Sequence, residues 1–193
     1  KLKVGHAGTL DPLATGLLII CVGKKTKEIS AYMGQRKEYI AQITFGGTTP
    51  SYDLESEIDA TFPTAHIDRA AIEAVLPQFT GDIQQYPPIF SAIKQGGVRI
   101  YEKARAGEEV VVEPRSITIH EQEILSFENN VLSLRVLCGK GTYIRSLAHD
   151  LGKALNSGAP LSGLRRTKIG SFEADGAKDP IQWSEYFKEV LER

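Results

Sequence analysis

Residues 5–16, near the start of the chain, place one aspartate among three glycines. The glycines permit tight turns and the close approach of a flat ligand to the backbone. Asp11 precedes Pro12, which disfavours a helical conformation at Asp11 and holds it in an extended one. A carboxylate fixed on such a stiff loop can act as a nucleophile or a general base. An Asp-Pro turn or a helix cap explains the same residues, and by pattern alone it is the commoner interpretation.

A second stretch, residues 139–147, runs from the end of a predicted strand into a predicted helix and carries Arg145 in the first helical turn. Free backbone N–H groups and the helix dipole favour an anion at this position, so a cation there needs a partner. That partner would be a carboxylate or a phosphate. A surface arginine on the polar side of an amphipathic helix fits the pattern equally well.

Two further stretches combine basic and aromatic residues. Residues 91–105 interleave lysines and arginines with Tyr101 around a glycine pair, a composition that suits contact with the phosphates and riboses of RNA. Ordinary helix surfaces show such mixtures too. Residues 37–39 bring Tyr39 to the start of a predicted strand, where its ring could stack on a base, although packing in the core is the commoner role.

The elements that must position these residues follow from hydrophobic periodicity and from turn residues. The best-defined helix covers residues 142–155, with Thr142 as its N-cap and an apolar stripe along one side. Asn129 and Asn130 are typical of a tight hairpin turn between two strands. Stretches 5–16, 46–65 and 80–100 are expected to be irregular. Further helices are expected at 24–33, 67–79 and 181–191, and strands at 17–22 (short and buried), 38–45, 116–127, 131–138 and 168–172.

Strands and helices mix here without a strict alternation, which predicts an α+β fold: a mixed, largely antiparallel sheet flanked by helices and loops. The 193 residues, 41% of them hydrophobic and 24% charged, fit one globular domain and exclude disorder of the whole chain. No apolar run reaches the roughly 18 residues of a membrane span. Cys21 and Cys138 lie in separate apolar runs and are expected to be buried thiols in a reducing compartment.

The formal net charge of −1 excludes a uniformly basic nucleic-acid binder. The charges are nevertheless unevenly placed: residues 1–40, 94–105 and 140–168 are net basic, whereas residues 41–82 carry one basic side chain against seven acidic ones. A local nucleic-acid-binding face and chance clustering of solvated charges explain this distribution equally well. The sequence shows no P-loop, no G-x-G-x-x-G, no G-x-S-x-G and no metal-ligand spacing of its histidines and cysteines, so no metal and no cofactor are expected.

Taken together and in order, these stretches resemble the TruB family of pseudouridine synthases, which act on the T-loop uridine of tRNA. The resemblance rests on G-H-x-G-T-L-D-P-x-A-x-G at 5–16, K-x-Y at 37–39, S-A-x-K-x-x-G-x-R-x-Y-E-x-A-R-x-G at 91–107 and G-T-Y-I-R-x-L-x-x-D-L-G at 141–152. Leu164-Arg165-Arg166 follows at the expected place. The match covers nearly all of residues 3–170 and implies the pseudouridine synthase fold.

The resemblance also implies a role for each matching residue. Asp11 would be the catalytic aspartate, Arg145 would pair with it, and Tyr39 would stack on the target base. A guanidinium beside the carboxylate would favour its charged form and fix its direction. The substrate-binding residues would be His6, which fills the place of the flipped-out uridine, Tyr143 and Leu164, which line the pocket around the base, and Lys94, Tyr101 and Arg105 on the RNA-facing surface.

The implied activity is isomerisation of uridine to pseudouridine at position 55 in the T-arm of tRNA. We expect a cytoplasmic, monomeric enzyme with no cofactor, no membrane association and no obligate protein partner. Residues 1–193 would form one catalytic domain whose first segment is missing and which lacks a C-terminal RNA-binding module. The sequence departs from the family at 49–53, where it reads T-P-S-Y-D in place of T-D-T-x-D, and the acidic stretch 41–82 is expected to face away from RNA.

Two rival functions share these motifs. The first is a guide-RNA-dependent pseudouridine synthase, although such proteins usually carry longer basic extensions than this chain has. The second is a non-catalytic RNA-binding or tRNA-folding protein on the same scaffold. The presence of Asp11, Tyr39 and Arg145 argues against a loss of catalysis.

Overall fold

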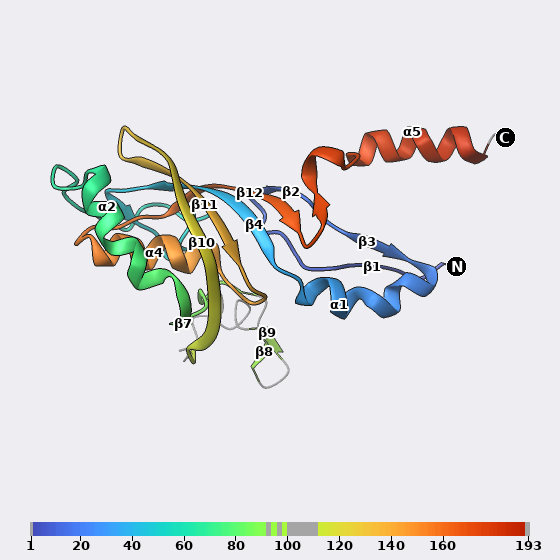
Figure 1. Cartoon of the computed structure of the whole chain (residues 1–193), viewed down its shortest axis with the longest axis horizontal. Coiled ribbons are helices and arrows are strands. Elements are labelled where there is room, and N and C mark those ends of the chain that lie inside the picture. The colour runs from blue at the N-terminus through green and yellow to red at the C-terminus, as the bar shows by residue number, and fades with distance from the viewer. Residues whose placement is uncertain (1, 92–93, 96–97, 100–111, 192–193) are drawn as a thin grey trace.

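The computed structural model describes residues 2–91, 94–95, 98–99 and 112–191. Its main feature is a bent sheet with the strand order β13-β12-β4-β11-β10-β7, in which neighbouring strands run antiparallel (Figure 1). A short strand, β2, adds to β12 in parallel. This architecture confirms the predicted α+β class. The strands are β2 (Ala14–Gly16), β4 (Lys37–Thr44), β7 (Gly81–Gln85), β10 (Arg115–Glu128), β11 (Val131–Cys138), β12 (Leu161–Ile169) and β13 (Phe172–Glu173).

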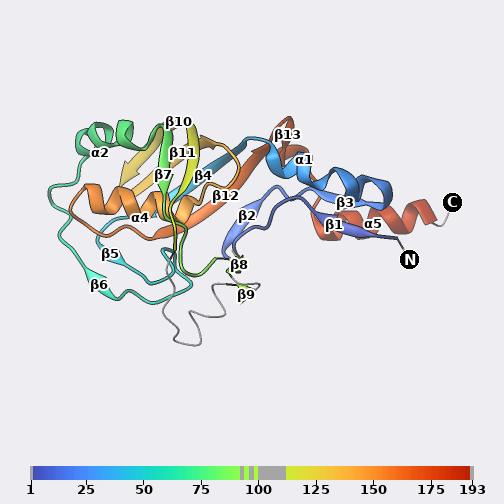
Figure 2. The same ribbon diagram turned by 90° about the horizontal axis from the view of Figure 1, so that it is seen from below.

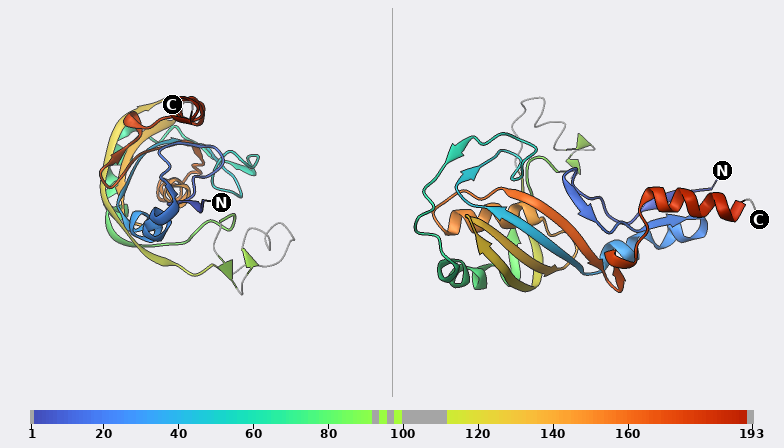
Figure 3. Two further views of the ribbon diagram at one scale, coloured as in Figure 1. Left: turned by 90° about the vertical axis from the view of Figure 1, so that its right-hand side faces the viewer. Right: turned by 90° about the horizontal axis from the view of Figure 1, so that it is seen from above.

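One face of the sheet is apolar because side chains alternate along each strand. In β11, Leu132, Leu134 and Val136 are fully buried, whereas Arg135 between them points to the other face. The buried face curves around helix α4 (Ile144–Ala154), which lies inside the arc of the sheet (left panel of Figure 3). The apolar stripe predicted for this helix is confirmed, since its members are buried in the core: Ile144, Leu147, Ala148, Leu151 and Leu155.

The helices fall close to their predicted positions. Residues 23–34 form a 3-10 turn, η1 (Gly23–Glu28), followed by α1 (Ile29–Gly34). Asp68 accepts a hydrogen bond from the Ala71 N–H and so caps α2 (Arg69–Val75), which continues as η2 (Leu76–Phe79). The prediction that Thr142 caps α4 is wrong: Tyr143 is the N-cap, and the Thr142 hydroxyl donates instead to the Gly139 carbonyl. The remaining helices are η3 (Ala174–Gly176) and α5 (Pro180–Leu191).

The hairpin between β10 and β11 is confirmed, and both turn residues adopt positive φ: 51° at Asn129 and 61° at Asn130. This conformation matches the type I′ turn that Asn tolerates well. The strand predicted at 168–172 is much too short, because β12 begins at Leu161 and β13 is a separate strand beyond Gly170. Residues 80–100 are less irregular than expected, since β7 forms one edge of the main sheet and β8 (Lys94–Gln95) pairs with β9 (Val98–Arg99).

The first 22 residues depart most from expectation. The stretch 5–16 is not wholly a loop, because it includes the end of β1 (Val4–His6) and all of β2. The expected buried strand at 17–22 shrinks to β3 (Ile20–Val22), which pairs with β1 outside the main sheet and buries only Cys21 among its three residues. Figure 2 shows β1, β3, α1 and α5 together beyond one end of the main sheet. The loop expected at 46–65 carries the short pair β5 (Gly47–Thr48) and β6 (Ala60–Thr61).

Cys21 and Cys138 are buried free thiols, as expected. Burial raises the pKa of the Cys138 thiol to about 11, which makes it unreactive at neutral pH. In the described part of the chain, no helix has both the length and the apolar character needed to cross a membrane.

Candidate active site

The structure brings Asp11 and Arg145 into contact, although 134 positions separate them in sequence. Arg145 donates from Nε to Oδ2 of Asp11 at 3.0 Å and from Nη2 to Oδ1 at 2.9 Å. Such a two-pronged pairing fixes both the position and the direction of a carboxylate. The Arg145 side chain is only 4% exposed, whereas that of Asp11 is 34% exposed. The buried guanidinium therefore holds Asp11 from the protein interior, and the other side of the carboxylate is open to solvent.

Asp53 is a second carboxylate at the same guanidinium. Its Oδ2 lies 3.6 Å from Arg145 Nε, and its side chain is 5% exposed. The other oxygen, Oδ1, accepts hydrogen bonds from the Ser51 hydroxyl and the Glu55 N–H. Arg145 Nη1 donates to the Ser51 and Phe90 carbonyls at 3.2 and 3.1 Å. Each of the three guanidinium nitrogens thus donates at least one hydrogen bond within the protein, as a buried guanidinium requires.

The site decides between the two interpretations of Arg145 that the sequence left open. Arg145 is buried, so it is not a surface arginine. Two carboxylates offset the unfavourable place of its positive charge in the first turn of α4. Asp53 belongs to the acidic stretch 41–82, which is expected to face away from RNA, yet it lies at this site. In the sequence, Asp53 is only the last residue of the stretch 49–53, where T-P-S-Y-D replaces the family pattern T-D-T-x-D. No local pattern signals its approach to Arg145; Ser51, two positions earlier, orients only its other oxygen.

The start of α4 is fixed by Gln85, a buried residue at the end of β7 that the sequence analysis missed. Gln85 accepts a hydrogen bond from the Tyr143 N–H and donates one to the Tyr143 carbonyl, at 2.8 and 3.1 Å. Ser146 adds a bond from its hydroxyl to the Tyr86 carbonyl at 2.7 Å. These contacts fix the helical turn that carries Arg145 against the edge strand of the sheet.

The glycine-containing loop is held by Arg166, a second residue whose role was missed. Its side chain is buried and donates to three carbonyls: those of Leu17 at 2.8 Å, Gly8 at 3.2 Å and Thr9 at 3.3 Å. Gly16 has a φ of 98°, and a Cβ there would lie 2.2 Å from the Arg166 carbonyl oxygen, so only glycine fits. Arg166 thereby ties both ends of the loop that carries Asp11 to the main sheet.

Tyr39 lies beside Arg166 in the main sheet. In the β4–β12 ladder its partner is Arg166, which in turn is the partner of Gly16 in β2. Directly paired residues project to the same face of a sheet, so Tyr39 and Arg166 share the face that packs on α4. Burial raises the pKa of Tyr39 to about 12, against the opposing effect of the Arg166 guanidinium. The phenol is therefore neutral in any physiological buffer.

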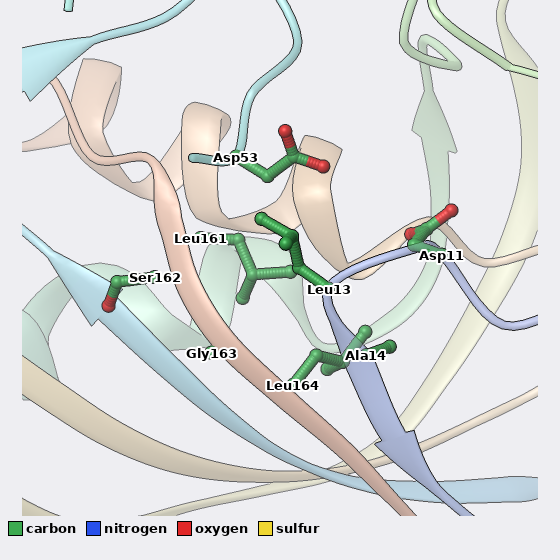
Figure 4. Close-up of a pocket in the computed structure, with 8 residues that line it drawn as sticks. All are labelled: Asp11, Leu13, Ala14, Asp53, Leu161, Ser162, Gly163 and Leu164. Atoms are coloured by element: carbon green, nitrogen blue, oxygen red, sulfur yellow. The ribbon is translucent and has the colours of Figure 1, made fainter. Parts of the chain in front are cut away.

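A small recess adjoins the two carboxylates (Figure 4). Leu164 is among its apolar residues, whereas Tyr143 lies at the N-cap of α4 and not in this lining. Burial raises the pKa of the Tyr143 phenol. The recess offers apolar surface next to a charged group, which suits a flat and partly polar ligand. It is lined by Asp11, Leu13, Ala14, Asp53, Leu161, Ser162, Gly163 and Leu164.

The other predicted substrate-binding residues are not part of the recess lining, and two of them lie outside the described part of the chain. His6 is exposed at the end of β1. Lys94 belongs to the short strand β8. Tyr101 and Arg105 fall outside the described residues. Within the described ranges no group of three or more His, Cys, Asp or Glu side chains is arranged to hold a metal ion.

Comparison with known proteins decides which family this site belongs to. Residues 1–144 match the model of the TruB family pseudouridylate synthase, N-terminal domain. The chain belongs to the TruB family. It is 60% identical over 179 residues to the tRNA pseudouridine synthase B of Flavobacterium johnsoniae, a match that covers 93% of this chain and 78% of the relative. The protein of the same name from Bacteroides fragilis is 54% identical over 186 residues, covering 96% of this chain and 80% of that relative.

Solved structures show the same TruB-type fold. A Cbf5-Nop10-Gar1 complex contains a chain that superposes with a TM-score of 0.71 at 31% identity, over 97% of this chain. An H/ACA RNP bound to a substrate RNA containing 2′-deoxyuridine gives a TM-score of 0.68 at 28% identity, also over 97% of this chain. This protein spans about half the length of those chains, 48% and 46% respectively.

Proposed function

We propose that this TruB-family enzyme isomerises uridine to pseudouridine in the T-loop of tRNA, at position 55, with Asp11 as its catalytic carboxylate. The observation that carries the proposal is the two-pronged Arg145–Asp11 pair, which leaves the carboxylate open to solvent above a buried guanidinium. The tRNA substrate is inferred from relatives named tRNA pseudouridine synthase B. The T-loop position is what the resemblance to the TruB motifs implies.

The reaction needs one ionised carboxylate and no net oxidation. The N1–C1′ bond breaks, the uracil turns, C5 bonds to C1′, the proton on C5 leaves and N1 gains a proton. Asp11 fits attack on the ribose, attack on the base and proton abstraction through a glycal, since each route starts from a directed carboxylate. Arg145 would keep Asp11 charged and aimed, and Asp53, which lies near the same Nε, would help to hold Arg145 in place.

The target base must first leave its stack, which costs a few kcal/mol and is cheapest in a loop. Tyr39 would recover part of that cost by stacking on the uracil, worth about 1–3 kcal/mol. A neutral phenol suits this role, and the raised pKa of Tyr39 keeps it neutral. Leu164 would supply apolar contact on the recess side, and His6 would occupy the vacated place in the RNA loop. Lys94, Tyr101 and Arg105 would contact the RNA backbone.

The guide-RNA-dependent alternative has one observation in its favour: the superposed structures include an H/ACA RNP. Identity to the relatives named tRNA pseudouridine synthase B is nevertheless far higher, 60% against 31% for the Cbf5 chain. We therefore infer guide-independent action on tRNA. A monomeric state and a cytoplasmic location remain predictions from the sequence.

Tritium release tests this proposal. A T-arm transcript labelled with tritium at C5 of its uridines is incubated with the protein and no other RNA. Release equal to one tritium per transcript, abolished when the T-loop target is replaced by cytidine, is the expected result. Binding without release would instead support a non-catalytic RNA-binding protein, and release only after addition of a guide RNA would support the guide-dependent class.

A further inference from the structure

Tyr52 has a backbone conformation that a tyrosine rarely adopts. Its φ is 64°, in the left-handed region that ordinarily favours glycine or asparagine. The residue lies between Ser51 and Asp53, both of which contact Arg145. Strained backbone persists only where surrounding contacts hold it, and it often marks a functional site. Contacts of the Tyr52 side chain and backbone must therefore hold this turn.

The side-chain contact is a ring stack with His149. The two ring centroids are 3.9 Å apart and the planes differ by 12°. His149 follows Arg145 by four residues in α4, so the two side chains project from the same side of the helix one turn apart. Burial lowers the pKa of His149, so its ring is neutral at physiological pH and stacks as one apolar face on another.

The backbone contact joins the same turn to the sheet. The Tyr52 carbonyl accepts a hydrogen bond from the Leu161 N–H at 2.9 Å, and Asp53 forms a bridge with Leu161 at the start of β12. Residues 51–53 therefore lie between α4, which carries Arg145, and β12, which carries the Arg166 anchor. The ring of Tyr52 contacts α4 through His149, and the Tyr52 carbonyl accepts its hydrogen bond from Leu161 of β12.

We propose that the Tyr52–His149 stack is a positioning device for the active site, which seats Ser51 and Asp53 against Arg145 and so aims its guanidinium at Asp11. Tyr52 and His149 act through Arg145 and touch no reacting atom. This inference rests on the proposed function for its effect on turnover. It also makes a claim about the RNA-free protein, namely that loss of the stack changes the environment of the Arg145 N–H groups.

Substitutions at Tyr52 separate the ring from the backbone conformation. Tyr52→Phe keeps the stack, whereas Tyr52→Leu removes it and retains a comparable volume. Tyr52→Gly removes the ring but relieves the left-handed strain, so it would improve the turn if the ring had no role. A stacked aromatic pair is worth enough to change a rate by about 2- to 12-fold.

The experiment measures single-turnover tritium release at saturating T-arm RNA, the Kd for that RNA, and the Nε–Hε resonance of Arg145 in the RNA-free protein. Tyr52→Leu, Tyr52→Gly and His149→Leu are expected to lower the maximal rate by about 2- to 12-fold at unchanged Kd and to shift or broaden the Arg145 resonance. Tyr52→Phe should match the parent in all three measurements. The double variant Tyr52→Leu/His149→Leu should be no slower than the slower single variant, because the two residues act as one unit.

The outcomes separate this inference from the proposed function. Parent-like rates and an unchanged Arg145 resonance in Tyr52→Gly and His149→Leu would overturn the inference alone. Additive losses in the double variant would overturn it as well. A parent protein that releases no tritium would overturn the proposed function, while the Arg145 resonance would still decide whether the stack holds the guanidinium.

Discussion

Two arginines of this protein each gather carboxylates, on opposite sides of the same sheet. Arg135 in β11 points away from the core and contacts Glu123, Glu121 and Glu38 at 2.7, 3.1 and 3.2 Å. Arg145 in α4 lies on the core side and contacts Asp11 and Asp53. The side chain of Arg135 is 25% exposed, against 4% for Arg145.

The difference lies in what each arginine joins. The partners of Arg135 sit on its own strand's neighbours, β4 and β10, which the sheet already holds together through backbone hydrogen bonds. The partners of Arg145 come from separate loops, which its guanidinium connects to α4. Exposed ion pairs contribute little to stability because water and salt screen them, whereas a buried charge must be fully partnered. The geometry therefore assigns surface electrostatics to Arg135 and site organisation to Arg145.

A matched pair of substitutions, one at each arginine, tests this difference with the largest expected effect. Arg145→Lys keeps the charge but loses the planar fork, and we expect single-turnover tritium release to fall roughly a hundredfold, since small misplacements of a catalytic group have effects of that size. Arg135→Lys should change the rate by less than about twofold. Circular dichroism should show that both variants are folded. Similar rates in the two variants would contradict the assignment.

Asp53 and Glu38 provide the next contrast, because each is an arginine-bound carboxylate. Asp53→Asn keeps acceptors for Ser51 and Glu55 but removes the negative charge beside Arg145, and we expect the rate to fall about tenfold, the effect of weakening one buried charged contact. Glu38→Gln should leave the rate unchanged. Rapid-quench measurements at saturating RNA would compare the two. An unaffected Asp53→Asn would show that Asp11 alone is sufficient to place the guanidinium.

The parts of this site that depend on local structure could be predicted from the sequence. The motif spacing placed Asp11 on a stiff loop and Arg145 at a helix start, and the unfavourable place of a cation there pointed to a partner. The contribution of Asp53 was not predictable, because its approach to Arg145 depends on the left-handed turn at Tyr52 and on packing between distant segments.

Most of strand β12, from Leu161 to Thr167, was missed for a related physical reason. It contains a glycine and two adjacent arginines, a composition typical of exposed polar segments, but Arg166 is buried because three loop carbonyls satisfy its guanidinium. A single sequence does not show such long-range hydrogen bonds. The β10–β11 hairpin and the stripe of α4 were predictable because they depend on local turn chemistry and periodicity.

Adjacent arginines in β12 extend the comparison to stability. Arg166→Lys would leave buried carbonyls of the glycine loop without donors, and we expect the free energy of unfolding to fall by about 2–4 kcal/mol. Arg165 is 49% exposed, and Arg165→Lys should change stability by less than about 0.5 kcal/mol. Urea titrations followed by tryptophan fluorescence or circular dichroism would measure both. Equal effects would show that the loop does not depend on its anchor.

The smallest expected effect concerns salt. Arg135→Gln should lower the free energy of unfolding by about 1 kcal/mol at low ionic strength, and the loss should nearly vanish at about 1 M salt, where the screening length is about 3 Å. Asp11→Asn should show no such salt dependence, because its partner is buried. If the loss of unfolding free energy in Arg135→Gln did not depend on salt, the ion pairs of Arg135 would behave like the buried Arg145–Asp11 pair, which would contradict the comparison.

The most direct test of the central claim is the single-turnover rate of Asp11→Asn with saturating, C5-tritiated T-arm RNA. The substitution preserves the size of the side chain and one acceptor for Arg145, so the folded structure and the Kd for RNA should stay close to those of the parent. We expect no tritium release above background. Measurable pseudouridine formation by Asp11→Asn would remove this carboxylate from the chemistry and contradict the account.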